Sequence, residues 1–501
     1  NFKIYFIRSL EVIKNKTLTF EQTVGGLAKE GENSLSVLDI SKRVQDYRND
    51  GIICDLFEGN APFRPRYIVP DYTIFMKNGS EFLGIKPATD IWEATHNLLM
   101  LYKHVPSITT MPVYLGNIDY LLEPYIKDEE EAYRAIKLFL KHIDTTITDS
   151  FCHANIGPKE TKAAYIILKA VKELELPTPN LTLKYSEETP DRLAIAAIDA
   201  SLVTAKPSFA NHKTYTKDFK GEYGIVSCYN GLKVGGGAYT LVRVKLGELS
   251  KKASSVDQFM NEVLPDLADS MLEYIDERIR FLVEETPFFD INFLVREGLI
   301  ERDKFSGLFG VVGLAECVNN LLEAEIQEER FGYSEKANKL GLEIVQKLDK
   351  IVKEHKNKYC PFTDGNHLLH AQVGIDTDHT DSPGCRVPVG EEPEIWDHLV
   401  QSAPFHKYFP SGIGDIFTFD ETYKKNPEAI LDIIKGAFES TDLRFISTYS
   451  SDCDVVRVTG YLVKKSEIAK LERGEAVLAD TTVLGMGARD NAKAFDRKLR
   501  Q

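Results

Sequence analysis

A single glycine in a valine-rich run constrains this chain more than any other feature. Gly460 lies in the segment Arg457-Val458-Thr459-Gly460-Tyr461, within a longer β-rich stretch over 454–463. Glycine has no β-carbon, so it accepts backbone conformations and close approaches that other residues resist. A bulge or bend in a strand is the ordinary explanation for such a glycine. The flanking Arg457 and Tyr461, and the place of the segment some tens of residues before residue 501, favour a functional loop.

The Arg-Val-x-Gly-Tyr segment resembles the radical-bearing loop of the glycyl radical enzymes. In that superfamily a hydrogen atom is removed from the glycine Cα, and the unpaired electron is stored on the backbone. Such a radical is delocalised into the adjacent amide groups when the Cα is planar, and a β-carbon would clash with the flanking peptides in that plane. The resemblance implies that Gly460 stores the radical, that Arg457 orients the loop through hydrogen bonds and that Tyr461 packs beside it.

Composition and charge exclude several classes of protein. A chain of 501 residues with 43% hydrophobic residues can build a sizeable core in one large domain or two to three ordinary ones. The net charge of −15 argues against binding to nucleic acid or to an anionic membrane surface. No apolar run reaches transmembrane length, and the start of the sequence, which is not a methionine, lacks the pattern of a signal peptide.

The cysteines argue against disulfides and against a thiolate-bound metal. Seven cysteines occur, at positions 54, 152, 228, 317, 360, 385 and 453. Their number is odd and no CxxC pair exists, so neither a disulfide framework nor a cysteine-type zinc or iron–sulfur site is expected. Free thiols fit a reducing cytoplasm, which is the predicted location. No bound metal is expected in this chain.

Hydrophobic periodicity predicts amphipathic helices that alternate with short strands. Helices are predicted over 130–144, 259–284, 334–356 and 426–438. Ser255 and Gln258 form a capping-box pattern before the second of these, and Pro265 either kinks that helix or marks its first turn. Strands are predicted over 112–115, 181–185, 239–246, 443–449 and 455–462. This alternation indicates an α/β architecture but does not choose between an open sheet and a barrel.

The resemblance to glycyl radical enzymes extends over most of the chain from about residue 112. Residues 179–191 and 206–211 are similar to segments that precede the active-site cysteine in the pyruvate formate-lyase group. Residues 235–246 and 309–316 resemble the anaerobic ribonucleotide reductases, and 112–125 resembles a stretch found in both groups. The chain length, the RVTGYLV form of the glycine loop and the Gly-Leu-Ala-Glu-Cys segment most resemble the YjjI family.

A buried backbone radical needs a relay to reach a substrate, and a cysteine S–H bond has a suitable strength. The resemblance implies that Cys228 is this relay, because it is the next cysteine after the matching segments. A small buried hydrophobic residue is the ordinary alternative for a free cysteine. Cys317 and Cys385 remain alternative relays. Four polar residues are further candidates for a substrate pocket: His153, Asn155, Asn211 and Glu316. His367 and His370 would align on a helix as metal ligands often do, although a polar loop fits them better.

Three departures separate the chain from well-known members of the superfamily. It has no four-cysteine zinc site beside the glycine loop, no adjacent cysteine pair, and no Val-Glu-Pro after Cys228. A ribonucleotide reductase-like enzyme that lacks the zinc site therefore stays open as an alternative. A non-radical thiol enzyme, with His212 activating Cys228, and a catalytically silent scaffold also stay open.

The superfamily implies an α/β barrel of about ten strands in two half-sheets, with helices outside and a C-terminal glycine loop. The expected domains are a barrel over 1–440, with a helical N-terminal part and a cysteine finger loop over about 223–237, and a glycyl radical domain over 441–501. The expected partner is a separate radical S-adenosylmethionine activase, which carries the iron–sulfur cluster. The expected substrate is a small organic molecule under anaerobic conditions, and a homodimer is expected by analogy.

Overall fold

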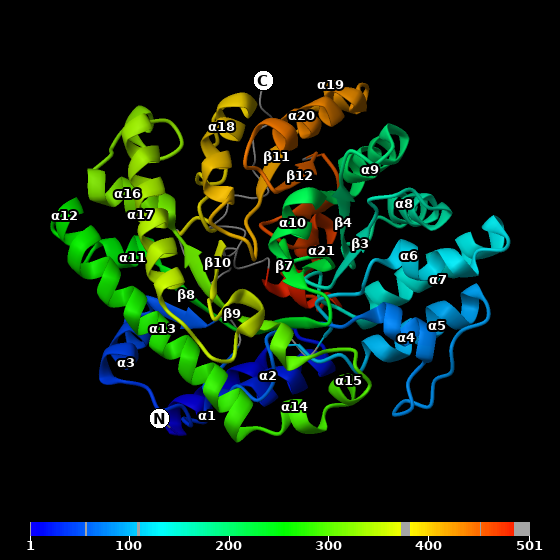
Figure 1. Cartoon of the computed structure of the whole chain (residues 1–501), viewed down its shortest axis with the longest axis horizontal. Helices are drawn as coiled ribbons and strands as arrows, with labels where there is room; N and C mark the ends of the chain where they lie inside the picture. Colours follow the sequence, from blue (N-terminus) through cyan, green and yellow to red (C-terminus); the bar gives the residue numbers. More distant parts are fainter. Residues whose placement is uncertain (1, 56–57, 108–110, 372–380, 451, 485–501) are drawn as a thin grey trace.

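The computed structural model describes residues 2–55, 58–107, 111–371, 381–450 and 452–484. Within these ranges the chain forms two mixed β-sheets surrounded by helices (Figure 1). None of the helices in these ranges is both long and apolar enough to cross a membrane. One large cluster of buried apolar side chains joins the helices to both sheets, and two smaller clusters lie around the β6–β7 hairpin and the β13–β14 hairpin.

The first sheet has five described strands and is organised around the long strand β8. β8, β9 and β10 run parallel, and β1 and β2 both pair with β8 in the antiparallel sense. The strands span β1 Ile53–Asp55, β2 Tyr67–Val69, β8 Gly236–Lys245, β9 Phe305–Val312 and β10 Leu368–Ala371. Every residue of β8 and β9 is buried, which is the pattern of strands covered on both faces.

The second sheet also has five described strands, in the order β11-β12-β5-β4-β3. β3, β4 and β5 run parallel, β12 is antiparallel to β5, and β11 is parallel to β12. The strands span β3 His153–Ile156, β4 Asn180–Tyr185, β5 Ser208–Asn211, β11 Asp415–Thr418 and β12 Phe445–Tyr449. The two half-sheets agree with the architecture that the sequence predicts.

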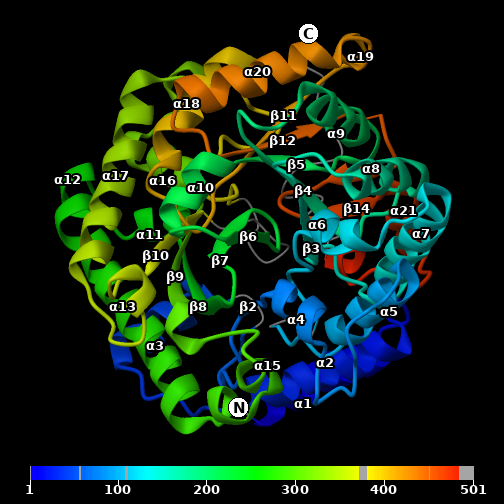
Figure 2. The ribbon, with the colours of Figure 1, turned by 45° about the vertical axis from the view of Figure 1, so that its right-hand side comes forward.

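Two hairpins complete the β-structure. β6 (Tyr223–Val226) and β7 (Asn230–Lys233) form a hairpin between the sheets, because β6 contacts β3 and β7 contacts β8. Figure 2 shows this hairpin at the centre of the ring of helices, with one sheet on each side. β13 (Val455–Arg457) and β14 (Leu462–Lys464) form the second hairpin, and Gly460 lies in the loop that joins them.

The helices form the outer layer of the molecule. The helices of the first half are α1 Phe2–Lys14, α2 Phe20–Asn33, α3 Lys42–Asn49, α4 Tyr72–Asn78, α5 Ile91–Tyr102, α6 Ile118–Leu122, α7 Glu129–Thr146, α8 Lys162–Leu174, α9 Asp191–Thr204, α10 His212–Asp218 and α11 Leu246–Ser250. The later ones are α12 Val256–Gln258, α13 Leu264–Arg280, α14 Phe288–Ile291, α15 Phe293–Arg296, α16 Leu314–Leu322, α17 Glu335–Glu354, α18 Ile395–His406, α19 Glu421–Lys424, α20 Pro427–Ser440 and α21 Lys465–Glu472.

The structure corrects three of the predicted elements. Residues 112–115 form no strand, although Leu115 donates a backbone hydrogen bond to His153 on β3. The predicted strand over 455–462 is a hairpin, because the chain reverses at the glycine loop. The predicted helix over 259–284 contains wide π-helical turns over 259–263 and 281–285 on either side of α13. Pro265 stands in the first turn of α13, where its missing N–H costs least.

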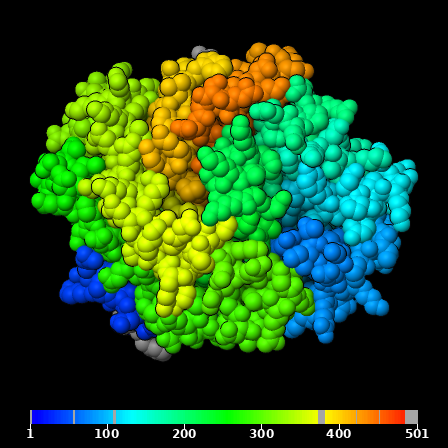
Figure 3. All heavy atoms as spheres, viewed as in Figure 1, coloured from blue at the N-terminus to red at the C-terminus, as the bar shows by residue number. Residues whose placement is uncertain are grey.

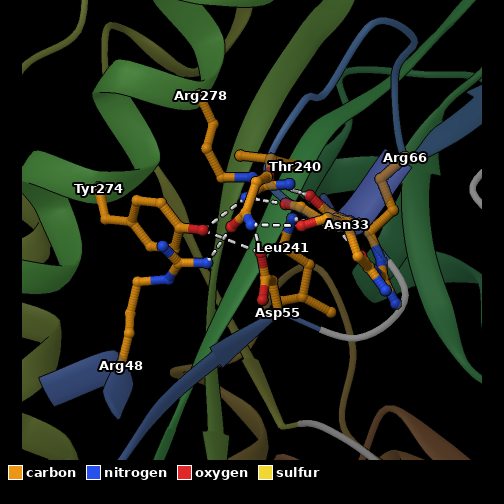
Figure 4. A network of polar contacts seen from close by, with 11 residues as sticks. Asn33, Arg48, Asp55, Arg66, Thr240, Leu241, Tyr274 and Arg278 are labelled. Carbon is orange, nitrogen blue, oxygen red and sulfur yellow. Dashed lines mark hydrogen bonds and ion pairs between the residues drawn. The ribbon is translucent and has the colours of Figure 1, made fainter. Parts of the chain in front are cut away.

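A buried network of charged residues ties the N-terminal segment to the first sheet and to α13 (Figure 4). The Arg278 guanidinium lies 2.6 Å from the Asp55 carboxylate and 3.2 Å from that of Glu58, and Glu58 also pairs with Arg66 at 2.6 Å. The backbone N–H of Leu241 on β8 donates to Glu58. Burial is the largest single influence and opposes the charged form of Asp55, but the charges of Arg278 and Arg48 and the hydrogen bond from Tyr274 together lower the pKa of Asp55 below its usual value.

Replacing Arg278 with methionine should therefore destabilise the fold strongly. The substitution leaves the buried Asp55 without its cation, a loss that typically costs about 3–5 kcal/mol. Urea denaturation followed by tryptophan fluorescence measures the change. The matched control is Arg43→Met, which removes a half-exposed ion pair to Asp266 and should cost less than about 1 kcal/mol. Equal losses in the two variants would contradict a special role for the buried network.

Candidate functional site

The β6–β7 hairpin, which carries Cys228 at its tip, is held in register by a side chain of the second sheet. The side-chain oxygen of Asn155 on β3 accepts a hydrogen bond from the Ile225 N–H at 2.8 Å, and its amide nitrogen donates to the Ile225 carbonyl at 2.8 Å. An asparagine side chain thus acts as one rung of a β-ladder. The buried Lys184 ammonium adds a bond to the Tyr223 carbonyl at 2.7 Å. These bonds fix how far the hairpin extends between the sheets.

His153 holds the turn itself. Ser227, the residue before Cys228, has a left-handed φ of 56°, and its carbonyl lies 2.6 Å from Nδ1 of His153. Because a carbonyl only accepts, Nδ1 carries the hydrogen, and Nε2 then accepts from the Thr182 hydroxyl at 2.7 Å. Burial lowers the pKa of His153 to about 3, so its ring stays neutral near pH 7. The turn is therefore fixed by a neutral hydrogen-bond chain.

Cys228 lies at the centre of this turn and is almost fully buried, with 2% of its surface exposed. Its Sγ is 3.3 Å from Oδ1 of Asn230. It belongs to an apolar cluster that includes Tyr215, Tyr229 and Phe445. Burial raises the pKa of the Cys228 thiol to about 11, although the Tyr229 backbone and the charge of Arg386 work in the opposite direction. The sulfur therefore keeps its hydrogen at neutral pH.

The glycine loop is held by hydrogen bonds to the carbonyl of Gly460. Asn180, the first residue of β4, donates from Nδ2 at 3.1 Å, and the Arg457 guanidinium donates at 3.3 Å. Arg457 also donates to Oδ1 of Asn180 at 3.2 Å and to the Ala205 carbonyl at 2.8 Å. Ser150 holds the other side of the loop, because its hydroxyl bonds both the N–H and the carbonyl of Leu462. The loop is thus fixed on both sides.

The anchors of the two loops share one rung of the second sheet. His153, which holds the cysteine turn, and Asn180, which holds the glycine carbonyl, are register partners on β3 and β4. Neighbouring strands are separated by about 4.8 Å, so the anchors of the two loops are adjacent. Phe151 packs against both apolar clusters, and its ring centroid lies 5.1 Å from that of Tyr461. The structure therefore brings Cys228 and Gly460 to the same region of the interior.

The alternative cysteines lie in different surroundings. Cys317 is buried on α16 in the main core, and burial raises the pKa of its thiol well above the ordinary value. Cys385 is also buried, and burial raises the pKa of its thiol well above the ordinary value. Arg386 lies 5.5 Å from the centroid of the Tyr229 ring and donates to the Gly414 carbonyl at 2.6 Å. Cys385 is therefore next in sequence to a residue that contacts the cysteine turn, whereas Cys317 lies in the main core.

Two other predicted pocket residues serve local structure. Asn211 caps α10 by accepting from the Thr214 N–H, and its amide nitrogen donates to the carbonyls of Phe438 and Leu443. Glu316 accepts hydrogen bonds from the N–H and the hydroxyl of Ser382. Burial raises the pKa of Glu316 to about 7. Neither residue has a described contact with the cysteine turn or the glycine loop.

The predicted histidine pair does not share a face. His367 directly precedes β10 and His370 lies within it, so the two are not aligned on a helix. His370 packs near Tyr229, with ring centroids 6.0 Å apart, whereas His367 contacts Asp276 on α13. His212 contacts the Tyr223 hydroxyl and Thr216.

Sequence reasoning missed several residues that hold the two loops. Asn180 and Ser150 clasp the glycine loop, and Lys206 binds the Pro179 carbonyl next to Asn180 at 2.6 Å. Burial lowers the pKa of Lys206 to about 7. The sequence shows Asn180 as a polar residue at the start of a strand. This position does not reveal that its partner, Gly460, lies 280 residues away.

Comparison with known proteins gives consistent relationships. The family model described as "Glycyl radical enzyme YjjI-like" matches residues 18–500. An uncharacterized protein of Haemophilus influenzae is 48% identical over 498 residues, which cover 98% of this chain and 97% of that protein. Among solved structures, the anaerobic ribonucleotide reductase of Thermotoga maritima with glycerol in its active site has a TM-score of 0.68 at 11% identity, covering 94% of this chain and 89% of that one. The B12-independent glycerol dehydratase of Clostridium butyricum has a TM-score of 0.66 at 12% identity, covering 94% and 84%.

Replacing Asn155 with alanine should loosen the cysteine hairpin. The variant leaves the buried N–H and carbonyl of Ile225 without their partner, which should cost about 2–6 kcal/mol at about 1–3 kcal/mol for each unsatisfied group. Hydrogen exchange should be faster at the Ile225 amide, and urea denaturation should report the loss of stability. The control is Asn97→Ala, which removes a hydrogen bond from an exposed side chain to the Lys86 carbonyl. Unchanged exchange at Ile225 would show that Asn155 does not set the register.

Proposed function

Because this chain belongs to the family of YjjI-like glycyl radical enzymes, we propose that Gly460 stores the radical and that Cys228 relays it to a small organic substrate. The observation that carries this assignment is the shared rung of β3 and β4. His153 binds the residue before Cys228, and its register partner Asn180 binds the carbonyl of Gly460. Hydrogen-atom transfer requires close contact between donor and acceptor, and the adjacent anchors support this pairing.

The proposed reaction is a series of hydrogen-atom transfers, and each hydrogen atom that leaves one group is taken up by the next. A radical S-adenosylmethionine activase takes one hydrogen atom from the Gly460 Cα and leaves an unpaired electron there. Cys228 then gives its S–H hydrogen to the Gly460 Cα, and the electron moves to sulfur. The thiyl group takes a hydrogen atom from a substrate carbon, and the product radical takes it back from the thiol. The protein positions the reacting atoms and excludes water.

The surroundings of Cys228 suit a hydrogen-atom donor. A relay of this kind needs an intact S–H bond, and the raised pKa of about 11 keeps the thiol neutral. The hydrogen bond from the thiol to Asn230 orients the S–H without removing its proton.

The same features count against a nucleophilic cysteine. A nucleophile needs a lowered pKa and an adjacent base or cation. The pKa of Cys228 is raised, and the described contacts of His212 are to Tyr223 and Thr216 rather than to the sulfur. Ribonucleotide reduction receives no support beyond the fold, because the similarity to the solved reductases is 11% in sequence.

Activation must expose a glycine that is buried in the closed state. β12 belongs to the second sheet, so we set the beginning of the radical domain after Tyr449 rather than at residue 441. The β13–β14 hairpin is a separate two-stranded sheet, which suits a segment that moves out to meet the activase. The remaining barrel then keeps both five-stranded sheets intact.

Anaerobic activation of the protein should produce an electron paramagnetic resonance signal at Gly460. The remaining α-hydrogen should split the signal into a doublet, and Gly460→Ala should abolish it. Arg457→Lys is a companion variant, because it keeps the charge but loses the forked contacts to Asn180 and Gly460 and should reduce the yield of radical. A full doublet in Gly460→Ala would place the radical elsewhere and refute the assignment.

The relay can be identified in the same experiment without knowing the substrate. In D2O the thiol becomes S–D, and reversible transfer between Cys228 and Gly460 should replace the α-hydrogen with deuterium. The doublet should therefore collapse in the wild type and persist in Cys228→Ser. Cys385→Ser and Cys317→Ser are the matched controls, and both should collapse as the wild type does. Persistence of the doublet in Cys385→Ser alone would transfer the relay to Cys385.

Alkylation should report the raised pKa of Cys228. Shifting a thiol pKa from 9.0 to about 11 lowers the thiolate fraction at pH 8 by roughly a hundredfold. Peptide-level mass spectrometry should show slow iodoacetamide labelling of Cys228 at pH 8, with a rate that rises up to about pH 11. The urea-unfolded protein serves as the reference for an unburied thiol. Rapid labelling at pH 7 in the folded protein would instead support the nucleophilic alternative.

A further inference from the structure

Three side chains from distant parts of the chain converge on the side of the molecule covered by α13 and α17. Nε2 of His355, which follows α17, lies 2.7 Å from one carboxylate oxygen of Asp276 on α13. Nε2 of His367, which precedes β10, lies 2.8 Å from the other oxygen. These ligand atoms all lie within 4.8 Å of one another. None of the three residues has a described contact with the cysteine turn or the glycine loop.

The neighbours of the cluster hold it in one orientation. The Asn357 amide donates to Asp276 at 2.7 Å, which fixes the rotation of the carboxylate. The His367 ring is fully buried, and Sγ of Cys360 lies 3.9 Å from its Nδ1. Gly307 on β9 makes room for the ring, since a β-carbon there would lie 2.4 Å from Nδ1. The ring is therefore placed with Nε2 directed at Asp276 and its other nitrogen in the core.

The donor set has the chemistry of a divalent transition-metal site. Two neutral imidazole nitrogens and one carboxylate oxygen are ligands that Zn²⁺ accepts, with a fourth position left for water. Tetrahedral ligands at about 2.0–2.1 Å from zinc are about 3.3 Å apart. The two imidazole nitrogens now contact different oxygens of Asp276 at 2.7 and 2.8 Å, so the side chains would rearrange around one of these oxygens. About a third of the surface of the Asp276 and His355 side chains is exposed, which leaves a path for a metal ion and water.

Both histidines come from the segment that links α17 to β10. In Figure 3 the bright yellow segment, which includes the residues between α17 and β10, lies on the visible surface of the molecule. The cluster thus joins this surface segment to Asp276 on α13.

We propose that Asp276, His355 and His367 bind one Zn²⁺ ion, with water as the fourth ligand. This inference departs from the expectation, drawn from the absence of CxxC pairs, that the chain holds no metal. The ion would join α13, the end of α17 and the start of β10 at a single point. β10 ends at Ala371, whose carbonyl accepts a hydrogen bond from the Tyr229 hydroxyl beside Cys228. The metal would therefore brace the strand that supports the cysteine turn.

The test uses the full chain in its unactivated form, treated with a chelator and then titrated with Co²⁺ alone. Wild-type protein should bind one equivalent and give the intense visible absorption of tetrahedral Co²⁺. Zn²⁺ added afterwards should displace the Co²⁺ and raise the melting temperature. Asp276→Asn and His355→Gln should bind Co²⁺ more than about a hundredfold more weakly, a loss at least as large as those known for supporting residues around metal sites.

His96→Gln is the matched control, because its exposed ring on α5 bonds only the Trp92 carbonyl among its described contacts. This variant should bind Co²⁺ as the wild type does. Circular dichroism confirms that each variant is folded, and the partly exposed His355 is the position where substitution disturbs the core least. Absence of stoichiometric binding in the wild type, or binding as tight as that of the wild type in His355→Gln and Asp276→Asn, would overturn the proposal. A hydrogen-bonded His–Asp–His cluster without metal would then be the correct description.

Discussion

The pairing of β3 with β4 is the contact on which the proposed chemistry depends. This parallel ladder aligns His153 with Asn180, and each of these side chains holds one of the two loops. A slip of one residue in the register would turn one of the two side chains to the opposite face of the sheet. The cysteine turn and the glycine loop would then lose their common anchor. The geometry of the site is thus a property of the sheet rather than of either loop.

Burial adds a chemical consequence to this geometry. A low-dielectric interior disfavours every charged form, so the Cys228 thiol and the His153 ring both stay neutral. Arg457 is an exception, because it is 1% exposed and keeps its charge among the carbonyls of Gly460 and Ala205 and the side chain of Asn180. Neutral hydrogen-atom donors and a fixed cation around a backbone carbonyl form an environment suited to radical rather than ionic steps.

Sequence patterns correctly predicted the helices and the motif that depend on neighbouring residues. The periodicity over 130–144 and 334–356 predicted α7 and α17 to within two residues at each end, and the motif around Gly460 indicated the family. Patterns failed where contacts between distant residues decide the structure. Asn180 reaches Gly460 across 280 residues, and His153 reaches Ser227 across 74. The run over 455–462 has the composition of one strand, but the loop at Gly460 reverses it into a hairpin.

The contacts of the glycine hairpin also indicate how it can open. Its strands pair only with each other among the described strands, and its attachment runs through Arg457, Asn180 and Ser150 rather than through a ladder with either sheet. At about 1 kcal/mol for each net hydrogen bond, these side-chain bonds amount to only a few kcal/mol. Opening would also return the buried Arg457 to water, which recovers part of the cost of its burial. The apolar cluster around Tyr461 is then the main barrier, and binding to a partner must compensate for its exposure.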